Sequence, residues 1–146
     1  MDDLLPALVG EWDGTYRLWL EPNVLRTEGP TTATGRAVAG GGFVAVEYDW
    51  TDLDGPQQGS FLMARPADDR WEVAWVDTWH TANGIMFCTG GPGPDVQVAY
   101  GPAEAPWGWR TTFERPAADE LVITAWNVTP AGEEAKATEA TYRRVS

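Results

Sequence analysis

The sequence predicts an all-β fold: a closed antiparallel up-and-down barrel of about ten strands, preceded by one short N-terminal helical turn. Three observations support this prediction. Short runs rich in β-branched and aromatic residues recur about every dozen residues, turn-forming Gly, Pro, Asp and Asn separate them, and helical periodicity is nearly absent. A sheet of consecutive strands leaves two edges exposed, and closing the sheet into a barrel removes both. A two-sheet sandwich is the alternative architecture.

The expected elements follow this rhythm of strands and turns. A helical turn is expected from Asp3 to Val9, because Asp2 or Asp3 can cap it and Gly10 ends it. The ten strands are expected at Thr15–Glu21, Thr31–Ala39, Phe43–Thr51, Gln57–Arg65, Arg70–Trp79, Gly84–Thr89, Asp95–Tyr100, Trp107–Arg115, Glu120–Val128 and Glu134–Val145. With 146 residues the chain has the length of one domain, which we place at residues 1–146.

The composition narrows the classes of function. The chain carries 22 acidic and 10 basic side chains, a formal net charge of −12, and has no basic cluster. This balance argues against binding to nucleic acid or to anionic membranes. A single cysteine excludes an internal disulfide, and the sequence shows neither a signal peptide nor an apolar run of about 18 residues. These features predict a cytoplasmic location.

Two short motifs lie near the two ends of the chain. Gly10-Glu11-Trp12 stands just before the first expected strand, and Tyr142-Arg143-Arg144 comes near the end of the last one. This pair resembles the calycin superfamily, which includes lipocalins and fatty-acid-binding proteins. In that superfamily a Trp on the first strand packs beneath a basic side chain from the last strand. The resemblance implies that Gly10, Trp12 and Arg143 close the floor of the barrel.

Further motifs follow one another through the rest of the chain. They are Gly41-Gly42-Phe43-Val44, Asp54-Gly55-Pro56 with Gly59, Trp75-Val76-Asp77, Gly132-Glu133 and Glu139-Ala140-Thr141-Tyr142-Arg143. In this order they resemble an uncharacterised bacterial family of calycin-like proteins, domain-of-unknown-function family 1579. The resemblance implies a calycin-like barrel over nearly the whole chain and brings no known activity with it.

The single histidine bears on cofactors and metals. A related calycin-like family, the nitrobindins, binds haem through a histidine near the C-terminus, whereas the present chain has only His80, between the fifth and sixth expected strands. No residue from 134 to 146 can replace that ligand, so no haem or other cofactor is expected. A metal site is not expected either. We interpret His80 as a solvated loop residue and Cys88 as a buried structural thiol.

Strand alternation predicts a strongly aromatic barrel interior. The predicted ligand-binding residues are Tyr16, Tyr48, Trp50, Trp75, Asp77, Trp79 and Trp109. Asp77 has two interpretations, because an inward carboxylate must be paired or hydrogen-bonded. In the first interpretation, Asp77 contacts the polar or cationic end of a ligand. In the second, it is paired within the protein with a Trp N–H, a Tyr hydroxyl or an interior arginine such as Arg17 or Arg110.

The function remains open between several hypotheses. The first is a binding protein, monomeric or homodimeric, that holds a small apolar or aromatic ligand in its interior. A surface for stacking sugars or a cage for a quaternary ammonium group is a variant of it. The second is a barrel enzyme that decarboxylates or cyclises small acids, for which Tyr48, Asp77, Glu47 and Arg110 supply the residue types. Strand parity turns Glu47 and Arg110 away from the other two, so no catalytic residue is assigned. The third is a filled-core dimerisation module without a ligand.

Overall fold

The computed structural model of the protein describes residues 4–145, and strands make up most of this range. One short helix precedes the strands, and a single 3-10 turn interrupts them. The elements are α1 (Leu4–Ala7), β1 (Gly10–Glu21), β2 (Val24–Val38), η1 (Ala39–Gly41), β3 (Phe43–Asp52), β4 (Gly55–Ala67), β5 (Arg70–Asp77), β6 (Met86–Gly90), β7 (Asp95–Tyr100), β8 (Trp107–Glu114), β9 (Glu120–Val128) and β10 (Glu134–Arg144). The predicted cap at Asp2 or Asp3 lies outside the described residues.

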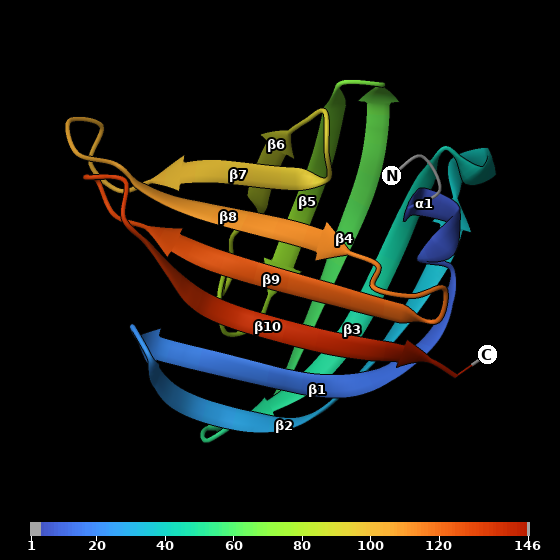
Figure 1. The fold of residues 1–146 in the computed structure, drawn as a ribbon, viewed down its shortest axis with the longest axis horizontal. Helices are drawn as coiled ribbons and strands as arrows, with labels where there is room; N and C mark the ends of the chain where they lie inside the picture. The colour runs from blue at the N-terminus through green and yellow to red at the C-terminus, as the bar shows by residue number, and fades with distance from the viewer. Residues whose placement is uncertain (1–3, 146) are drawn as a thin grey trace.

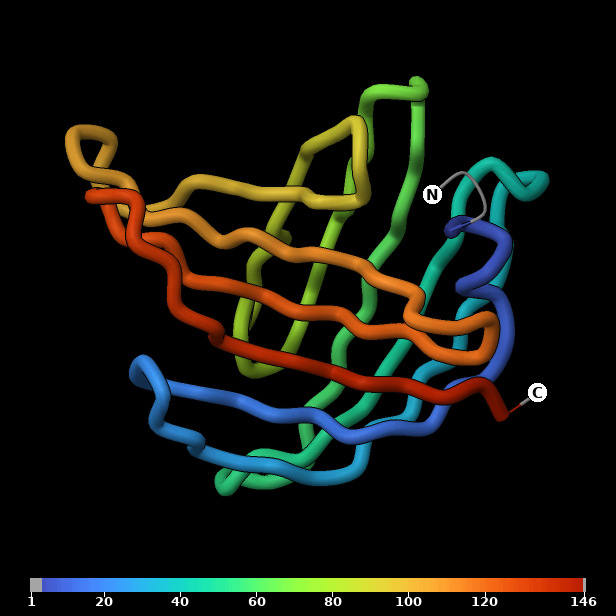
Figure 2. Tube along the Cα trace, viewed as in Figure 1, coloured from blue at the N-terminus to red at the C-terminus, as the bar shows by residue number. Residues whose placement is uncertain are grey.

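The strands form one closed antiparallel barrel. Each strand pairs with the next along the chain, and β1 also pairs with β10, which joins the two edges of the sheet. In Figure 1, β8, β9, β10 and β1 cross in front of β3, β4 and β5, and Figure 2 shows the same arrangement as a continuous trace. The predicted up-and-down barrel is confirmed, and the alternative of a two-sheet sandwich is wrong. No helix among residues 4–145 has the length and hydrophobicity needed to cross a membrane.

Strand alternation places the core where the sequence predicts it. In β3, Val44, Val46, Tyr48 and Trp50 are buried, whereas the residues between them are half-buried or exposed. The same alternation buries Trp71, Val73 and Asp77 in β5. The core is therefore the inside of the barrel, and it is rich in aromatic rings that pack on one another.

The floor of the barrel is closed by contacts between the two ends of the chain. Trp12 is 2% exposed, and its indole N–H donates to the Leu8 carbonyl at 3.2 Å. The Arg144 guanidinium lies 4.3 Å from the centre of the Trp12 ring, and it also donates to the carbonyls of Ala7 and Val9, each at 2.7 Å. A shielded cation–π contact of this kind stabilises by about 1–2 kcal/mol.

Arg143 does not take part in this closure, which corrects the prediction. The register pairs Trp12 with Arg144, whereas Arg143 pairs with Asp13 on the outer face of the barrel. There Arg143 forms a surface ion pair with Glu120, and its side chain is 73% exposed. The alternation of side chains along β10 therefore assigns the basic residue of the floor to Arg144. Gly10, the third predicted closure residue, opens β1 at a φ of 130°, a conformation that suits glycine.

Two expected strand boundaries are wrong in a way that affects the site. β2 begins at Val24 instead of Thr31, because it pairs with β1 along a long hairpin that turns at Pro22 and Asn23. β5 ends at Asp77 instead of Trp79, because the chain turns there. The turn is stabilised by hydrogen bonds from the backbone N–H groups of Thr81 and Ala82 to the carbonyl of Asp77.

The barrel wall is weakest between β6 and β7. These strands pair only at Thr89 with Gln97 and at Gly90 with Val96, next to the loop that joins them. Beyond these two pairs no ladder joins β6 to β7, so the strands diverge away from the loop. The wall is therefore held by the fewest hydrogen-bonded pairs on this side of the barrel.

Candidate functional site

The barrel encloses a small internal cavity. The space open to the centre of a water molecule is about 40 Å³, so the protein's own side chains fill most of the interior. Aromatic rings form much of the lining, namely Trp12, Tyr16, Tyr48, Phe61, Trp75, Trp109 and Tyr142. His80, Thr111 and Thr138 supply further polar groups, and no Asp, Glu, Lys or Arg among residues 4–145 lines the cavity. The cavity is thus suited to an uncharged occupant.

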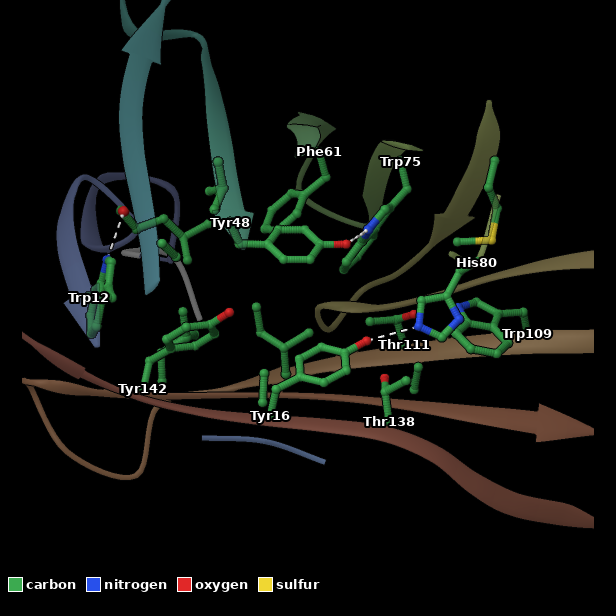
Figure 3. A pocket seen from close by; sticks show the side chains of 18 residues that line it. Trp12, Tyr16, Tyr48, Phe61, Trp75, His80, Trp109, Thr111, Thr138 and Tyr142 are labelled. Atoms are coloured by element: carbon green, nitrogen blue, oxygen red, sulfur yellow. Dashed lines mark hydrogen bonds between the residues drawn. The ribbon is translucent and has the colours of Figure 1, made fainter. Parts of the chain in front are cut away.

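The two ends of the cavity differ in polarity. Figure 3 shows Trp12 and Tyr142 at one end and His80, Trp109, Thr111 and Thr138 at the other, with the Tyr16 hydroxyl directed toward His80. At the floor, the Tyr142 hydroxyl is already hydrogen-bonded to Thr31 Oγ1 at 3.0 Å. Burial there raises the pKa of Tyr142 to about 12. The groups free to meet a ligand are therefore at the other end.

The turn after β5 carries His80 over the mouth of the barrel. Asp77 Oδ1 accepts hydrogen bonds from the backbone N–H groups of Trp79 at 2.8 Å and His80 at 3.0 Å, which holds the turn. The His80 ring then lies near the Trp50, Trp79 and Trp109 rings, with centroid distances of 5.7, 4.9 and 5.5 Å. Its Nε2 is 2.9 Å from the Tyr16 hydroxyl. The interpretation of His80 as a solvated loop residue is wrong, because the turn folds it inward.

The Tyr16–His80 pair is uncharged around neutral pH. Burial lowers the pKa of His80, and the nearby carboxylates of Asp77 and Asp52 only partly oppose this effect. Burial and the negative charge of Asp77 raise the pKa of Tyr16 well above its ordinary value. A protonated phenol beside a neutral imidazole gives a hydrogen-bonded couple with no net charge.

Asp77 is completely hydrogen-bonded within the protein. Its Oδ2 accepts the Tyr48 hydroxyl at 2.6 Å and the Trp50 indole N–H at 3.2 Å, while Oδ1 accepts the two turn N–H groups. The Tyr48 hydroxyl in turn accepts the Trp75 indole N–H at 2.7 Å. Of the two interpretations of Asp77, the structure shows the hydrogen-bonded one. The carboxylate is 2% exposed and does not line the cavity.

The predicted ligand-binding residues fall into two groups. Tyr16, Tyr48, Trp75 and Trp109 line the cavity. Trp50 and Asp77 lie behind the lining, and Trp79 borders an outer groove. The residue types named for the enzyme hypothesis are not brought together, because Arg110 pairs with Asp95 and Glu134 outside the barrel, and Glu47 pairs with Arg36. Cys88 is completely buried, and burial raises the pKa of its thiol to about 11.

An outer groove of about 570 Å³ adjoins the cavity where β6 and β7 diverge. His80, Met86 and Trp109 line both spaces, so they form a partition between them. Large apolar side chains border the groove on the surface, with Ile85 75% exposed and Phe87 52% exposed. The groove leads from an apolar rim to the polar end of the cavity.

Thr111 is the unusual member of the lining. It lies on β8, is 0% exposed, and its hydroxyl has no hydrogen-bond partner among residues 4–145. Strand alternation in β8 already predicts that Thr111 points inward together with Trp109. The sequence alone gave no sign that its hydroxyl lacks a partner, because that depends on the neighbouring strands.

Several solved structures share this fold. Rv2717c from M. tuberculosis superposes with a TM-score of 0.69 at 15% identity, covering 99% of this chain and 96% of that one. The S-type phycobiliprotein lyase CPES from Guillardia theta gives 0.57 at 10% identity, with 99% and 92% coverage. A designed fluorescence-activating β barrel gives 0.54 at 12% identity, with 99% of each chain covered. At these identities the likeness shows a shared barrel fold.

The sequence itself also matches a family model. Comparison with curated proteins gives no match. The model for DUF1579, described as a protein of unknown function, matches residues 1–144. Since this match spans nearly the whole chain, the protein belongs to the DUF1579 family.

Proposed function

We propose that this protein binds a small, mostly apolar ligand inside the barrel and that the ligand enters through the groove between β6 and β7. The observation that carries the proposal is the partition of His80, Met86 and Trp109, which lines both the inner cavity and the outer groove. Rotation of these side chains joins the two spaces into one site. The groove alone has the volume of a typical small-molecule site, about 300–1,000 Å³.

The size of the cavity sets a condition on binding. At about 40 Å³ it holds roughly three water molecules, which is too little for an aromatic ring. Binding therefore requires the partition to move. Met86 suits this role because its side chain is flexible, and it stands on β6, the strand with the fewest ladder partners on one side.

Two of the structural relatives are compatible with such a function. One is named as a phycobiliprotein lyase and another as a fluorescence-activating barrel. Both have the present fold, so a barrel of this shape is able to carry functions of that kind. The assignment for this chain rests on its own cavity and groove.

The test uses toluene, a neutral probe of about the size of one side-chain ring, with NMR of the tryptophan indole N–H groups. We expect toluene to shift the signals of Trp75 and Trp109, which line the cavity. Ala125→Leu fills the cavity from β9 and should reduce toluene affinity at least about tenfold. The matched control is Ala74→Leu on the outer face of β5, which should leave the affinity unchanged.

A result in which Ala125→Leu binds toluene as well as the unmodified protein would overturn the proposal, because the probe would then sit outside the barrel. Native mass spectrometry of gently purified protein adds an independent readout. A discrete non-covalent adduct that is lost on denaturation, and absent from Ala125→Leu, would give the mass of the natural ligand.

A further inference from the structure

We infer that the ligand is uncharged and carries one hydrogen-bonding group, and that Thr111 together with the Tyr16–His80 pair recognises that group. This inference rests on the proposed function and adds the chemical class of the ligand. It also names the residue that sets specificity.

Within residues 4–145, the Thr111 hydroxyl lacks the partner that a buried polar group needs. Buried polar groups in proteins are nearly always hydrogen-bonded, because an unpaired one loses its bonds to water without replacement. Thr111 is fully buried, lines the cavity and has no partner among the described residues. Its hydroxyl is able to donate or to accept, so it can pair with a hydroxyl, carbonyl or amide group of a ligand.

Other polar groups of the lining lie close to Thr111. Figure 3 shows Thr111 at the same end of the cavity as His80 and the hydroxyl of Tyr16. His80 directs Nε2 toward the Tyr16 hydroxyl at 2.9 Å. One polar group on a ligand therefore meets several partners at one end, while apolar rings surround the rest of the molecule.

The charges around this end of the cavity favour a neutral ligand. No cationic side chain in the described part of the chain lines the cavity, so a carboxylate or phosphate would be buried without a counter-charge from it. The nearest carboxylates do not offer a site for a cation either. Asp77 already accepts hydrogen bonds from Tyr48 and Trp50 as well as from the turn, and Asp52 is paired with Arg26 at 2.9 Å. Both charge signs are disfavoured, and a neutral ligand remains.

Phenol, toluene and benzoate test this inference. Phenol and toluene have nearly the same shape, with a hydroxyl group in one where the other has a methyl group, and benzoate adds a negative charge. Affinities are measured by NMR titration of the unmodified protein and of Thr111→Val, which exchanges the hydroxyl for a methyl group of similar size. We expect Thr111→Val to lower the ratio of phenol to toluene affinity by about tenfold, the value of one buried hydrogen bond. Benzoate should bind at least tenfold more weakly than phenol.

Two controls separate this effect from a general change in the barrel. Thr112→Val alters the next residue of β8, which points to the other face, and should leave the ratio unchanged. Thr111→Ser keeps the hydroxyl and should retain the preference for phenol. Thr111→Val should also raise the melting temperature, since it removes an unpaired buried hydroxyl; if it does not fold, Thr111→Ala serves instead.

The outcomes distinguish this inference from the function on which it rests. If toluene binds inside the barrel but Thr111→Val leaves the ratio unchanged, the inference is overturned and the proposed function stands. Benzoate binding as tightly as phenol also overturns it. If neither toluene nor phenol binds inside the barrel, the proposed function fails, and the inference fails with it.

Discussion

The two ends of this barrel differ in how they are closed. At the floor, α1, Trp12 and Arg144 close the opening, and the polar groups of Trp12 and Tyr142 are hydrogen-bonded within the protein. At the other end, β6 and β7 diverge, and the hydroxyl of Thr111 has no partner in the described chain. The difference teaches that one end of the barrel stabilises the fold, while the other holds the groove through which we propose that a ligand enters.

The open end is nevertheless well organised. Asp77 fixes the turn that positions His80, and its bonds to Tyr48 and Trp50 connect that turn to β3. The open end is therefore a defined partition of three side chains, His80, Met86 and Trp109. This arrangement fits the proposed entry of a ligand without unfolding of the barrel.

The largest effect that this comparison predicts is on Trp12. Trp12→Ala should lower the free energy of unfolding by about 3–5 kcal/mol, because it leaves a cavity under the floor and removes the surface on which Arg144 stacks. Urea denaturation measures the loss. The matched change at the other end is Trp107→Ala, where the ring is 40% exposed, and it should cost less than about 1 kcal/mol. Equal losses would contradict the division between the two ends.

The second prediction concerns the anchor of the open end. Asp77→Asn should cost about 1–3 kcal/mol, because the amide replaces one carboxylate oxygen with a donor that faces other donors. The NMR signals of the His80 ring should move as the turn loosens. Asp95→Asn, at an exposed ion pair with Arg110, is the control and should cost less than about 0.5 kcal/mol. If Asp77→Asn leaves the free energy of unfolding unchanged, the turn does not depend on the carboxylate.

The third prediction compares the contributions of two neighbouring arginines to the stability of the floor. Arg144→Ala should cost about 2 kcal/mol, since it removes the contact with Trp12 and the hydrogen bonds to Ala7 and Val9. Arg143→Ala should change stability by less than about 0.5 kcal/mol, because its ion pair with Glu120 is exposed. Thermal and urea unfolding of both variants measure the two losses of stability. A larger loss for Arg143→Ala than for Arg144→Ala would show that Arg143 closes the floor.

The smallest effect concerns the protonation of His80. Because burial lowers the pKa of His80 in the folded state below its ordinary value of 6.5, the unfolded chain binds the proton more readily than the folded one. The contribution of His80 to stability is therefore complete above pH 6.5 and decreases as the pH falls from there toward the folded pKa. Unfolding curves recorded from pH 7.5 to 5 measure how steeply the free energy of unfolding changes with pH.

His80→Gln is the control for that measurement, because the chain has no other histidine. The variant should show a flatter dependence of stability on pH across the same range. A variant with the full slope of the unmodified protein would assign the pH dependence to carboxylates elsewhere.

Sequence patterns predicted the fold well because the strands alternate clearly. Val44, Val46, Tyr48 and Trp50 are buried on one face of β3, as expected. The pattern failed where the backbone leaves the ideal strand. Alternation counted from Trp12 predicts that Leu20 points inward, but it is 55% exposed, because the register between β1 and β2 shifts after Leu18.

The candidate site was harder to predict from sequence, because its key groups depend on turns and on neighbouring strands. A strand continued to Trp79 would turn His80 to the face opposite Asp77. Instead the strand ends at Asp77, whose side chain accepts hydrogen bonds from the backbone N–H groups of Trp79 and His80. Arg143 and Arg144 are adjacent in the sequence and equivalent in type, so only the register with Trp12 separates them. The missing partner of Thr111 is a property of the assembled barrel.

The pairing of β1 with β10 has a consequence for the synthesis of this protein. Leu18 of β1 pairs with Thr138 of β10, so the barrel cannot close until the last strand has left the ribosome. Until then the growing sheet exposes the edge of β1 at one side and its newest strand at the other. Such edges invite pairing with other chains, so the nascent barrel is vulnerable to aggregation until β10 has emerged and paired with β1.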